Sequence, residues 1–299
     1  MFAKSWMVSG RITELLFHER LLLQQENSGV GEARNTGIKN AKYDWIAFLD
    51  GDDIWYPNHL QELQNIINLY PYSGLISTNY VECNINQIIP EIDLADSNIF
   101  EINYFIEASK KLGIIWTSSA AVKYSVVKSV GGFKRFKAGE DLEFWARVAL
   151  DFPVAISTRV TAVYFRGTMG TMETINTQKN NTPVEPIKLK DLSPPIALLL
   201  ECMDYPKYVS KRLCIVTYIN SRVYRCVIGS LYQENVKDAK ELLLLAITPK
   251  SLKIKVLGYL FIMSDFLIRN LLVIIKKAYK IIMKKNNIHE IKIDALSIK

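Results

Sequence analysis

The first 170 residues alternate between short apolar runs and longer amphipathic segments, a pattern that predicts strands alternating with helices. The run "DWIAFLD" at 44–50 is nearly continuous, as expected of a central strand covered on both faces. Further apolar runs of strand length lie at 73–83, 114–124 and 154–166. Strands that alternate with helices are typical of an open α/β sheet, so we predict an α/β fold with helices on both faces.

The amphipathic segments between these runs predict the helices. They lie at 31–41, 57–70, 101–112 and 125–130, with another that runs from Glu140 to the proline at 153. In the first of these helices, the residues on one face are small or apolar: Ala33, Gly37, Ile38 and Ala41. Small side chains let a helix lie close against a sheet, so we expect this face to be the buried one.

A polar, proline-bearing stretch at 168–195 predicts a boundary between two parts of the chain. Beyond it the sequence reads as helices. We therefore predict an α/β domain at 1–170, a linker at 171–195, a helical and membrane-associated region at 196–285, and a tail at 286–299.

The basic charge of the chain is concentrated near its C-terminus. Residues 250–299 contain eleven Lys and Arg against three acids, a net charge of +8, so the other 249 residues carry −1. A nucleic-acid-binding protein would place its basic charge on the folded core, and we predict no nucleic-acid partner.

An apolar stretch at 256–275 lies inside this basic region and has the length of a membrane span. Asp265 and Arg269 interrupt it, and each would cost about 2.5–3.5 kcal/mol at a bilayer centre. An interfacial helix on an anionic leaflet is one interpretation, which places the protein in the cytoplasm at the inner face of a membrane. A helix packed on the rest of the protein is the other, and we weigh the two equally.

Cysteine and histidine usage argues against disulfides and zinc. The four cysteines are scattered without CxxC spacing and the three histidines form no cluster: Cys83, Cys202, Cys214, Cys226, His18, His59 and His289. Free thiols in a reducing compartment are the simpler interpretation, and a zinc site is not expected.

Three carboxylates follow the central strand within four residues, at Asp50, Asp52 and Asp53. Like charges this close repel each other, and none is cheap to bury. A turn followed by a helix cap would explain one of them, which we take to be Asp53. Asp50 and Asp52 are two residues apart and can face one point, where Mg²⁺ or Mn²⁺ and the phosphates of a nucleotide would balance their charge.

Three segments in this order resemble family-two glycosyltransferases of the GT-A fold: 27–60, 131–149 and 162–172. In that family an N-x-G…A-R-N-x-G helix leads to a strand that ends in L-D-x-D-D, and a G-G-F…E-D motif follows later. The first segment carries most of the resemblance, with matches at Asn27, Gly29, Ala33, Arg34, Asn35, Gly37, Ala41, Phe48, Leu49, Asp50, Asp52, Asp53 and Pro57.

The resemblance implies an inverting glycosyltransferase with a GT-A, Rossmann-like sheet. Asp50 and Asp52 would hold Mg²⁺ or Mn²⁺ on the diphosphate of a nucleotide-sugar, and Asp50 would also contact the donor ribose. Asp141, with Glu140 beside it, would be the catalytic pair, and Asp141 would take the proton from the acceptor hydroxyl. A third group, at Asn27, Gly29 and Arg34, would lie at the donor.

Two of these assignments have simpler alternatives. Arg34 could be a solvated arginine on a helix surface. Glu140 and Asp141 could serve only as acids that favour a helix N-terminus.

The sequence departs from the family at its start. The family begins with P-x-Y/F-N and V-D-D-G-S elements that hold the nucleotide base, and residues 1–26 contain neither motif. We therefore expect an N-terminally truncated domain whose sheet lacks a central strand and exposes apolar surface there.

Two functions remain open on the sequence alone. The first is transfer of a sugar from a nucleotide donor to a glycan or lipid-linked acceptor, in the assembly of bacterial surface polysaccharide. The second is an inactive remnant or accessory module that keeps the fold and binds a membrane or partner. A metal-dependent phosphatase or nuclease would need more acidic or histidine ligands than the sequence offers.

Overall fold

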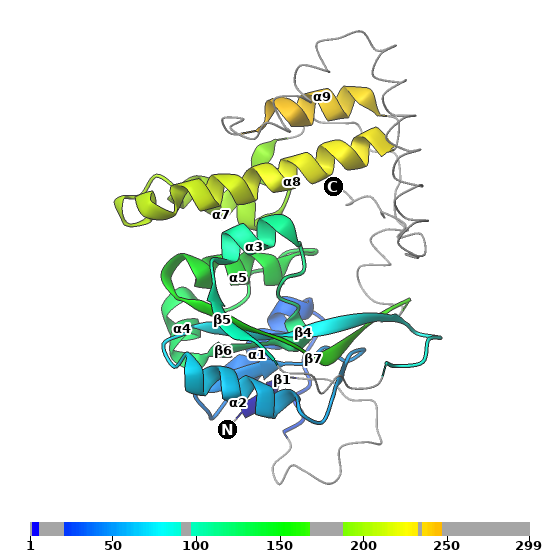
Figure 1. Cartoon of the computed structure of the whole chain (residues 1–299), viewed down its shortest axis with the longest axis vertical. Helices are drawn as coiled ribbons and strands as arrows, with labels where there is room; N and C mark the ends of the chain where they lie inside the picture. The colour runs from blue at the N-terminus through cyan, green and yellow to red at the C-terminus, as the bar shows by residue number, and fades with distance from the viewer. Residues whose placement is uncertain (1, 6–20, 91–96, 168–187, 233–234, 247–299) are drawn as a thin grey trace. The chain divides into compact units, whose positions relative to one another are not determined.

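A computed structural model of the chain describes residues 2–5, 21–90, 97–167, 188–232 and 235–246 (Figure 1). The chain divides into two compact units, Met1–Glu173 and Thr174–Lys299. The predicted boundary and linker at 171–195 fall mostly on residues outside the described ranges, so the domain limits stay a prediction.

The first unit is built on a seven-stranded mixed sheet with the strand order β1-β2-β6-β4-β7-β3, in which β5 also pairs with β7. β6 runs antiparallel to both of its neighbours, whereas β4 and β7 are parallel. The strands are β1 (Phe2–Ser5), β2 (Trp45–Phe48), β3 (Ile54–Trp55), β4 (Leu75–Asn84), β5 (Ile99–Ile102), β6 (Ala120–Lys123) and β7 (Val154–Arg166).

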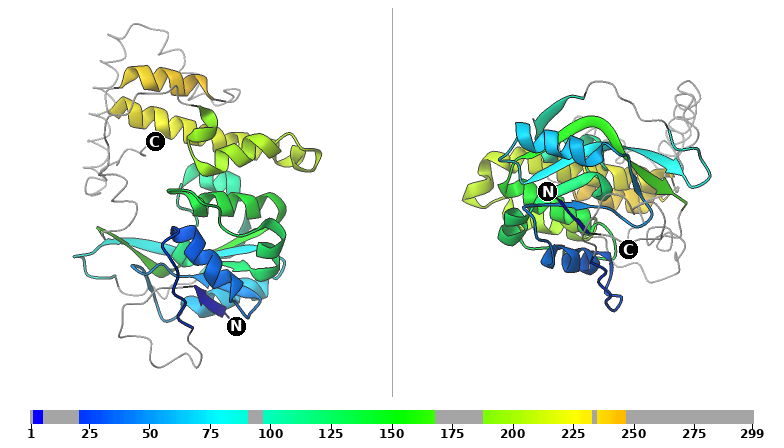
Figure 2. Two further views of the ribbon diagram at one scale, coloured as in Figure 1. Left: turned by 180° about the vertical axis from the view of Figure 1, so that it is seen from behind. Right: turned by 90° about the horizontal axis from the view of Figure 1, so that it is seen from below.

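Helices cover both faces of this sheet, as the sequence predicted (Figures 1 and 2). On one face, Leu63 and Ile66 of helix α2 (His59–Leu69) pack against Ala47 of β2. On the other face, Trp145 of helix α5 (Glu140–Asp151) lies against Phe48, with ring centroids 6.0 Å apart. Successive residues of β2 therefore point into two different cores, which explains why its sequence is continuously apolar.

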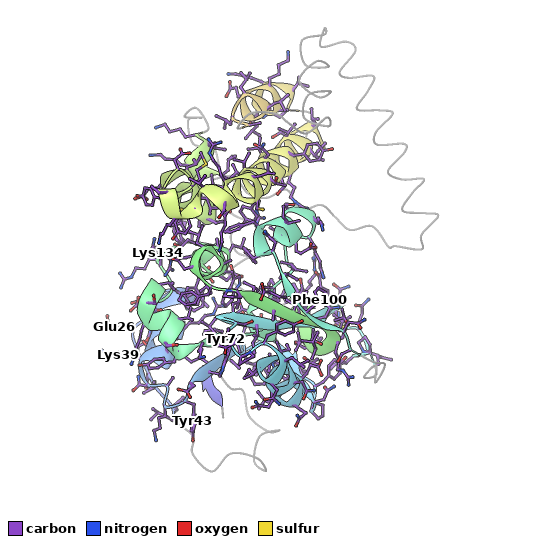
Figure 3. The ribbon with its side chains drawn as sticks, turned by 60° about the vertical axis from the view of Figure 1, so that its left-hand side comes forward. Glu26, Lys39, Tyr43, Tyr72, Phe100 and Lys134 are labelled. Carbon is purple, nitrogen blue, oxygen red and sulfur yellow. The ribbon has the colours of Figure 1, made fainter. Side chains whose placement is uncertain are left out.

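The remaining helices in the described part of this unit are short. They are α1 (Val30–Lys39), α3 (Tyr104–Lys110), α4 (Tyr124–Val130) and the 3₁₀ turn η1 (Thr117–Ser119). Aromatic side chains also lie on the outside of the unit, since Tyr72 is 88% exposed and Phe100 is 39% exposed (Figure 3).

Two expectations about local structure are wrong, and a third is not tested. β1 pairs in parallel with β2 along its whole length and lies at the end of the strand order, so the expected loss of a central strand stays a prediction. The segment 101–112 is not a single helix: β5 ends at Ile102 after pairing with β7, and α3 begins only at Tyr104. The strand predicted at 114–124 is limited to β6, since the residues before it form η1.

The buried face of α1 also differs from the predicted one. Gly31, Arg34 and Ile38 are buried, whereas Ala33 is exposed. The predicted face left out Arg34, which has carboxylate partners in the protein interior.

The second unit is helical in its described part. It contains η2 (Leu189–Asp191), α7 (Pro194–Cys202), η3 (Pro206–Lys211), α8 (Arg212–Tyr232) and α9 (Val236–Leu244). Val223 and Val227 of α8 share an apolar core with Leu242 of α9. None of the helices in the described residues has both the length and the apolar character of a membrane span. The stretch 256–275 lies outside the described residues.

The four cysteines are free, and Cys83, Cys202 and Cys226 are buried. The expectation of unpaired thiols is therefore confirmed.

Candidate active site

The acidic turn after β2 is anchored by its third carboxylate. Asp53 is 7% exposed, and its Oδ2 accepts hydrogen bonds from Trp116 Nε1 at 2.8 Å and Ser118 Oγ at 2.5 Å. Its Oδ1 accepts another from the backbone N–H of Phe165 on β7 at 3.2 Å. Burial raises the pKa of Asp53 to about 6 although these donors favour its charged form. The role proposed for Asp53 as a helix cap is wrong, because α2 has Asn58 at its N-cap position.

The first carboxylate of the turn faces a buried arginine. Asp50 Oδ1 accepts a hydrogen bond from Arg34 Nη2 at 2.7 Å, and the backbone N–H of Asp50 donates to Ser118 Oγ at 3.0 Å. Asp52 lies at the exposed end of the same turn. Of the two acids predicted to bind metal, one is therefore fixed by the protein and the other is at the surface.

Arg34 joins this turn to the start of α5. Its other terminal nitrogen, Nη1, donates to Glu140 Oε1 at 2.6 Å, and the residue as a whole is only 7% exposed. Burial acts to lower the pKa of Arg34, but the charges of Asp50 and Glu140 outweigh it and leave the pKa raised. The interpretation of Arg34 as a solvated surface residue is therefore wrong.

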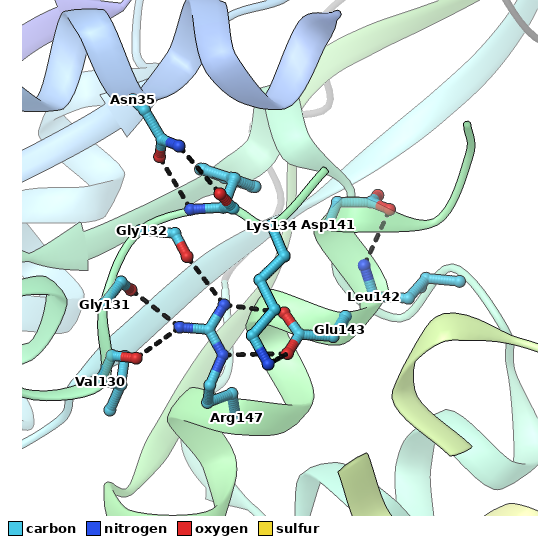
Figure 4. A network of polar contacts seen from close by, with 10 residues as sticks. Asn35, Val130, Gly131, Gly132, Lys134, Asp141, Leu142, Glu143 and Arg147 are labelled. Carbon is cyan, nitrogen blue, oxygen red and sulfur yellow. Dashed lines mark hydrogen bonds and ion pairs between the residues drawn. The ribbon is translucent and has the colours of Figure 1, made fainter. Parts of the chain in front are cut away.

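The residue after Arg34 connects α1 to the loop that precedes α5. The side-chain amide of Asn35 donates to the backbone carbonyl of Phe133 at 2.8 Å and accepts from its backbone N–H at 2.8 Å (Figure 4). A Cβ atom on Gly132 would lie 2.3 Å from Asn35 Oδ1, a distance that real Cβ contacts do not reach. The Gly-Gly-Phe sequence thus leaves space for the amide of the A-R-N-x-G helix.

Arg147 holds the turn that leads from α4 toward this contact (Figure 4). Its guanidinium donates to the carbonyl oxygens of Val130, Gly131 and Gly132 at 2.5–2.9 Å. It also forms a two-point ion pair with Glu143, one turn earlier on α5. A positive charge on the last carbonyls of a helix is favourable, so Arg147 fixes the end of α4 relative to α5.

Asp141 lies half-buried in the first turn of α5, next to Glu140. Its Oδ1 accepts a hydrogen bond from the N–H of Leu142 at 2.8 Å, and its Oδ2 lies 3.5 Å from Thr117 Oγ1. Burial, together with the negative charges of Glu140 and Asp50, raises the pKa of Asp141 to about 6 despite the opposing charge of Arg34. A carboxyl group with this pKa can exchange protons near neutral pH.

The two remaining predicted donor residues lie outside this network. Asn27 and Gly29 are exposed and precede α1, and Asn27 Oδ1 accepts a hydrogen bond from the N–H of Gly29 at 3.2 Å. Gly29 has a φ of 89°, a left-handed conformation that favours glycine. The structure thus brings Arg34, Asp50, Glu140 and Asp141 together, and it places Asn27 and Gly29 in the loop before α1.

The acids at the turn are suited to a cation that a substrate also helps to bind. No group of three or more His, Cys, Asp or Glu side chains in the described part of the chain could hold a metal ion by itself. Asp50 uses Oδ1 for Arg34, and its Oδ2 has no hydrogen bond to any described residue. Mg²⁺ and Mn²⁺ prefer oxygen ligands, and Mg²⁺ is usually held by one or two carboxylates with substrate phosphates, so Asp50 and Asp52 fit such a site.

Sequence reasoning missed a segment whose side chains contact Asp53 and Asp141. Trp116, Thr117 and Ser118 were read as part of a strand, yet each has a side chain that contacts Asp53 or Asp141. They belong to no motif, and their partners are 24–65 positions away in the chain. Only the fold brings them to the site.

One known family matches part of the chain. Residues 12–131 match the family described as glycosyl transferase family 2. The structure is similar to S. aureus TarS (residues 1–349, in complex with UDP-GlcNAc), with a TM-score of 0.53 and 14% identity over 75% of this chain and 64% of that one. At this identity the likeness concerns the fold alone, which is that of the GT-A glycosyltransferases.

Two curated relatives are similar over shorter segments. The succinoglycan biosynthesis protein ExoW of Rhizobium meliloti is 54% identical over 41 residues, 13% of each chain. The Escherichia coli UDP-Glc:alpha-D-GlcNAc-diphosphoundecaprenol beta-1,3-glucosyltransferase WfgD is 40% identical over 70 residues, 23% of this chain and 27% of its own. The chain therefore matches only 13% and 27% of the length of these two relatives.

Proposed function

We propose that this protein is an inverting glycosyltransferase that transfers a sugar from a nucleoside-diphosphate donor to a glycan or lipid-linked acceptor, in the synthesis of bacterial surface polysaccharide. The observation that carries the proposal is the Arg34 bridge, which joins the D-G-D-D turn to the Glu140–Asp141 pair. The names of the relatives, which concern succinoglycan and a diphosphoundecaprenol-linked sugar, support the acceptor class.

Asp50 and Asp52 are the residues that would hold Mn²⁺ or Mg²⁺ and, through it, the donor diphosphate. When bound, the cation offsets the negative charge that gathers on the leaving diphosphate. Arg34 supports this arrangement because it fixes Oδ1 of Asp50 and leaves the orientation of that carboxylate defined. We place Asn27 and Gly29 near the donor only on the family resemblance.

Asp141 is the group that would take the proton from the attacking acceptor hydroxyl. The raised pKa of Asp141 suits a general base, because the group is deprotonated at neutral pH and still accepts a proton readily. Glu140 is paired with Arg34, so in this proposal it orients the start of α5 and does not exchange protons. Attack by the hydroxyl oxygen on the face opposite the diphosphate then inverts the anomeric carbon in a single displacement.

The basic tail suggests how such an enzyme would reach a lipid-linked acceptor. We propose that residues 250–285, which lie outside the described ranges, attach the protein to the inner face of a membrane without crossing it. Electrostatic attraction of about 1 kcal/mol per basic residue near an anionic leaflet would add to apolar insertion.

This attachment should be sensitive to salt, which screens exposed charges. In flotation assays, the full chain should bind anionic liposomes at low salt and be released at high salt, and it should not bind neutral liposomes. Failure to bind anionic liposomes at low salt would contradict the membrane proposal, and resistance to both salt and carbonate would indicate a spanning segment instead.

Replacement of Asp52 by Asn should weaken Mn²⁺-dependent binding of uridine diphosphate, because the amide removes a hard anionic ligand. The measurement is titration calorimetry with uridine diphosphate, with and without Mn²⁺. Asp44→Asn is the matched control, since Asp44 is an exposed acid immediately before the first residue of β2, whereas Asp52 follows the strand. Metal-dependent binding that is equal in the wild type and the Asp52 variant would remove Asp52 from the site.

Replacement of Asp141 by Asn should reduce turnover by at least about 100-fold, the usual contribution of a general base, and leave uridine diphosphate binding nearly unchanged. In the wild type, turnover should fall about tenfold per pH unit below about pH 6, because Asp141 must be deprotonated to act. The assay is release of uridine diphosphate from UDP-glucose and UDP-N-acetylglucosamine in the presence of acceptor. Asp151→Asn, at the far end of α5, is the control, and turnover by the Asp141 variant within a few-fold of wild type would exclude the base assignment.

A further inference from the structure

Three consecutive residues in the turn before β6 contact the acids of the candidate site. Trp116 donates to Asp53, Thr117 lies beside Asp141, and Ser118 contacts both Asp53 and the backbone of Asp50. None of the three belongs to the family motifs in this sequence. Among them, Ser118 makes the shortest contact and connects two members of the acidic turn.

The hydroxyl group of Ser118 is fully buried and its hydrogen bonds have a defined direction. A serine hydroxyl carries one proton and two acceptor lone pairs. The proton goes to Asp53 Oδ2 at 2.5 Å, and a lone pair accepts the backbone N–H of Asp50 at 3.0 Å. The carbonyl of Ser118 also accepts the indole N–H of Trp55, just beyond the turn. Ser118 therefore contacts the turn at Asp50 and at Asp53, and it also contacts Trp55 just after the turn.

We propose that Ser118 is a positioning residue for the metal-binding turn. Its hydroxyl fixes the backbone of Asp50 relative to the buried Asp53, and this fixes the directions in which Asp50 and Asp52 present their carboxylates. Ser118 acts only through these residues and does not itself contact the cation or the diphosphate. The inference rests on the proposed function of Asp50 and Asp52 as the site for a divalent cation and a nucleoside diphosphate.

The neighbouring serine offers a matched comparison. Ser119 is also fully buried, and its hydroxyl is also hydrogen-bonded, to Ser77 Oγ at 2.9 Å and to the carbonyl of Trp116 at 2.9 Å. None of these partners is an acid of the site. Loss of either hydroxyl leaves buried polar groups without a partner, so both alanine variants should be destabilised, and Ser118→Ala more so because its lost hydrogen bond is to a carboxylate.

The test compares Ser118→Ala with Ser119→Ala in the full chain, using the melting temperature and the affinity for uridine diphosphate with and without Mn²⁺. We expect the melting temperature to fall in both variants and to fall further in Ser118→Ala. Substitution of a residue that orients metal ligands typically lowers metal affinity by about 10–100-fold, so Mn²⁺-dependent affinity should fall about tenfold in Ser118→Ala. It should change less than about threefold in Ser119→Ala, and metal-free binding should be unchanged in both.

Ser118→Cys serves as a second variant if the alanine change unfolds the protein. It nearly preserves the volume and keeps a weak donor, so it should retain the melting temperature and lose part of the Mn²⁺-dependent affinity. Equal affinities in Ser118→Ala and Ser119→Ala, or wild-type affinity in a folded Ser118→Cys, would overturn the inference and leave the proposed function standing. A wild-type chain that does not bind uridine diphosphate with Mn²⁺ would overturn the proposed function, and this inference with it.

Discussion

The buried guanidinium of Arg34 is the interaction on which the candidate site depends. It pairs with Asp50 at 2.7 Å and with Glu140 at 2.6 Å, and these two acids, one after β2 and one at the start of α5, lie 90 positions apart in the chain. Loss of one partner from a buried ion pair typically costs about 3–5 kcal/mol, because the other charge is left uncompensated. The same helix adds a neutral connection to the loop before α5, in which Asn35 pairs with the backbone of Phe133.

Arg34 also changes how the cluster of carboxylates is to be understood. The sequence suggested that a divalent cation and a diphosphate would balance Asp50 and Asp52 and that Asp53 would cap a helix, but the protein itself balances part of the charge of the turn. Asp50 is paired with Arg34, and Asp53 is held by three donors in the interior. Only Asp52 extends to the exposed end of the turn. A cation would therefore bind to a turn that the protein already holds in place, and the phosphates of a substrate would supply its remaining ligands.

The sequence predicted the elements that neighbouring residues alone define. The apolar run of β2, the amphipathic α2 and the acids at the start of α5 were all identified from sequence. The spacing of apolar residues and the residue types that favour a helix start can both be recognised within a few positions of the chain. What failed depended on distant partners. Ile99–Ile102 forms a strand only because β7 is beside it, and the buried face of α1 follows the acids that meet Arg34. Ser118 and Trp116 could not be found, since their partner Asp53 is 63–65 positions away and no motif marks them.

The most direct test of this account is a double-mutant cycle between Arg34 and Glu140, with Arg34→Gln, Glu140→Gln and the double variant compared with wild type in urea unfolding. If the bridge organises the site, the coupling free energy between the two residues should be about 2 kcal/mol or more, as for other close charge pairs. The exposed pair Arg135–Glu32, with Nε and Oε2 3.7 Å apart, should show less than about 1 kcal/mol in the same analysis. Additive effects of the two Arg34–Glu140 substitutions, within about 0.5 kcal/mol, would contradict the central role of Arg34.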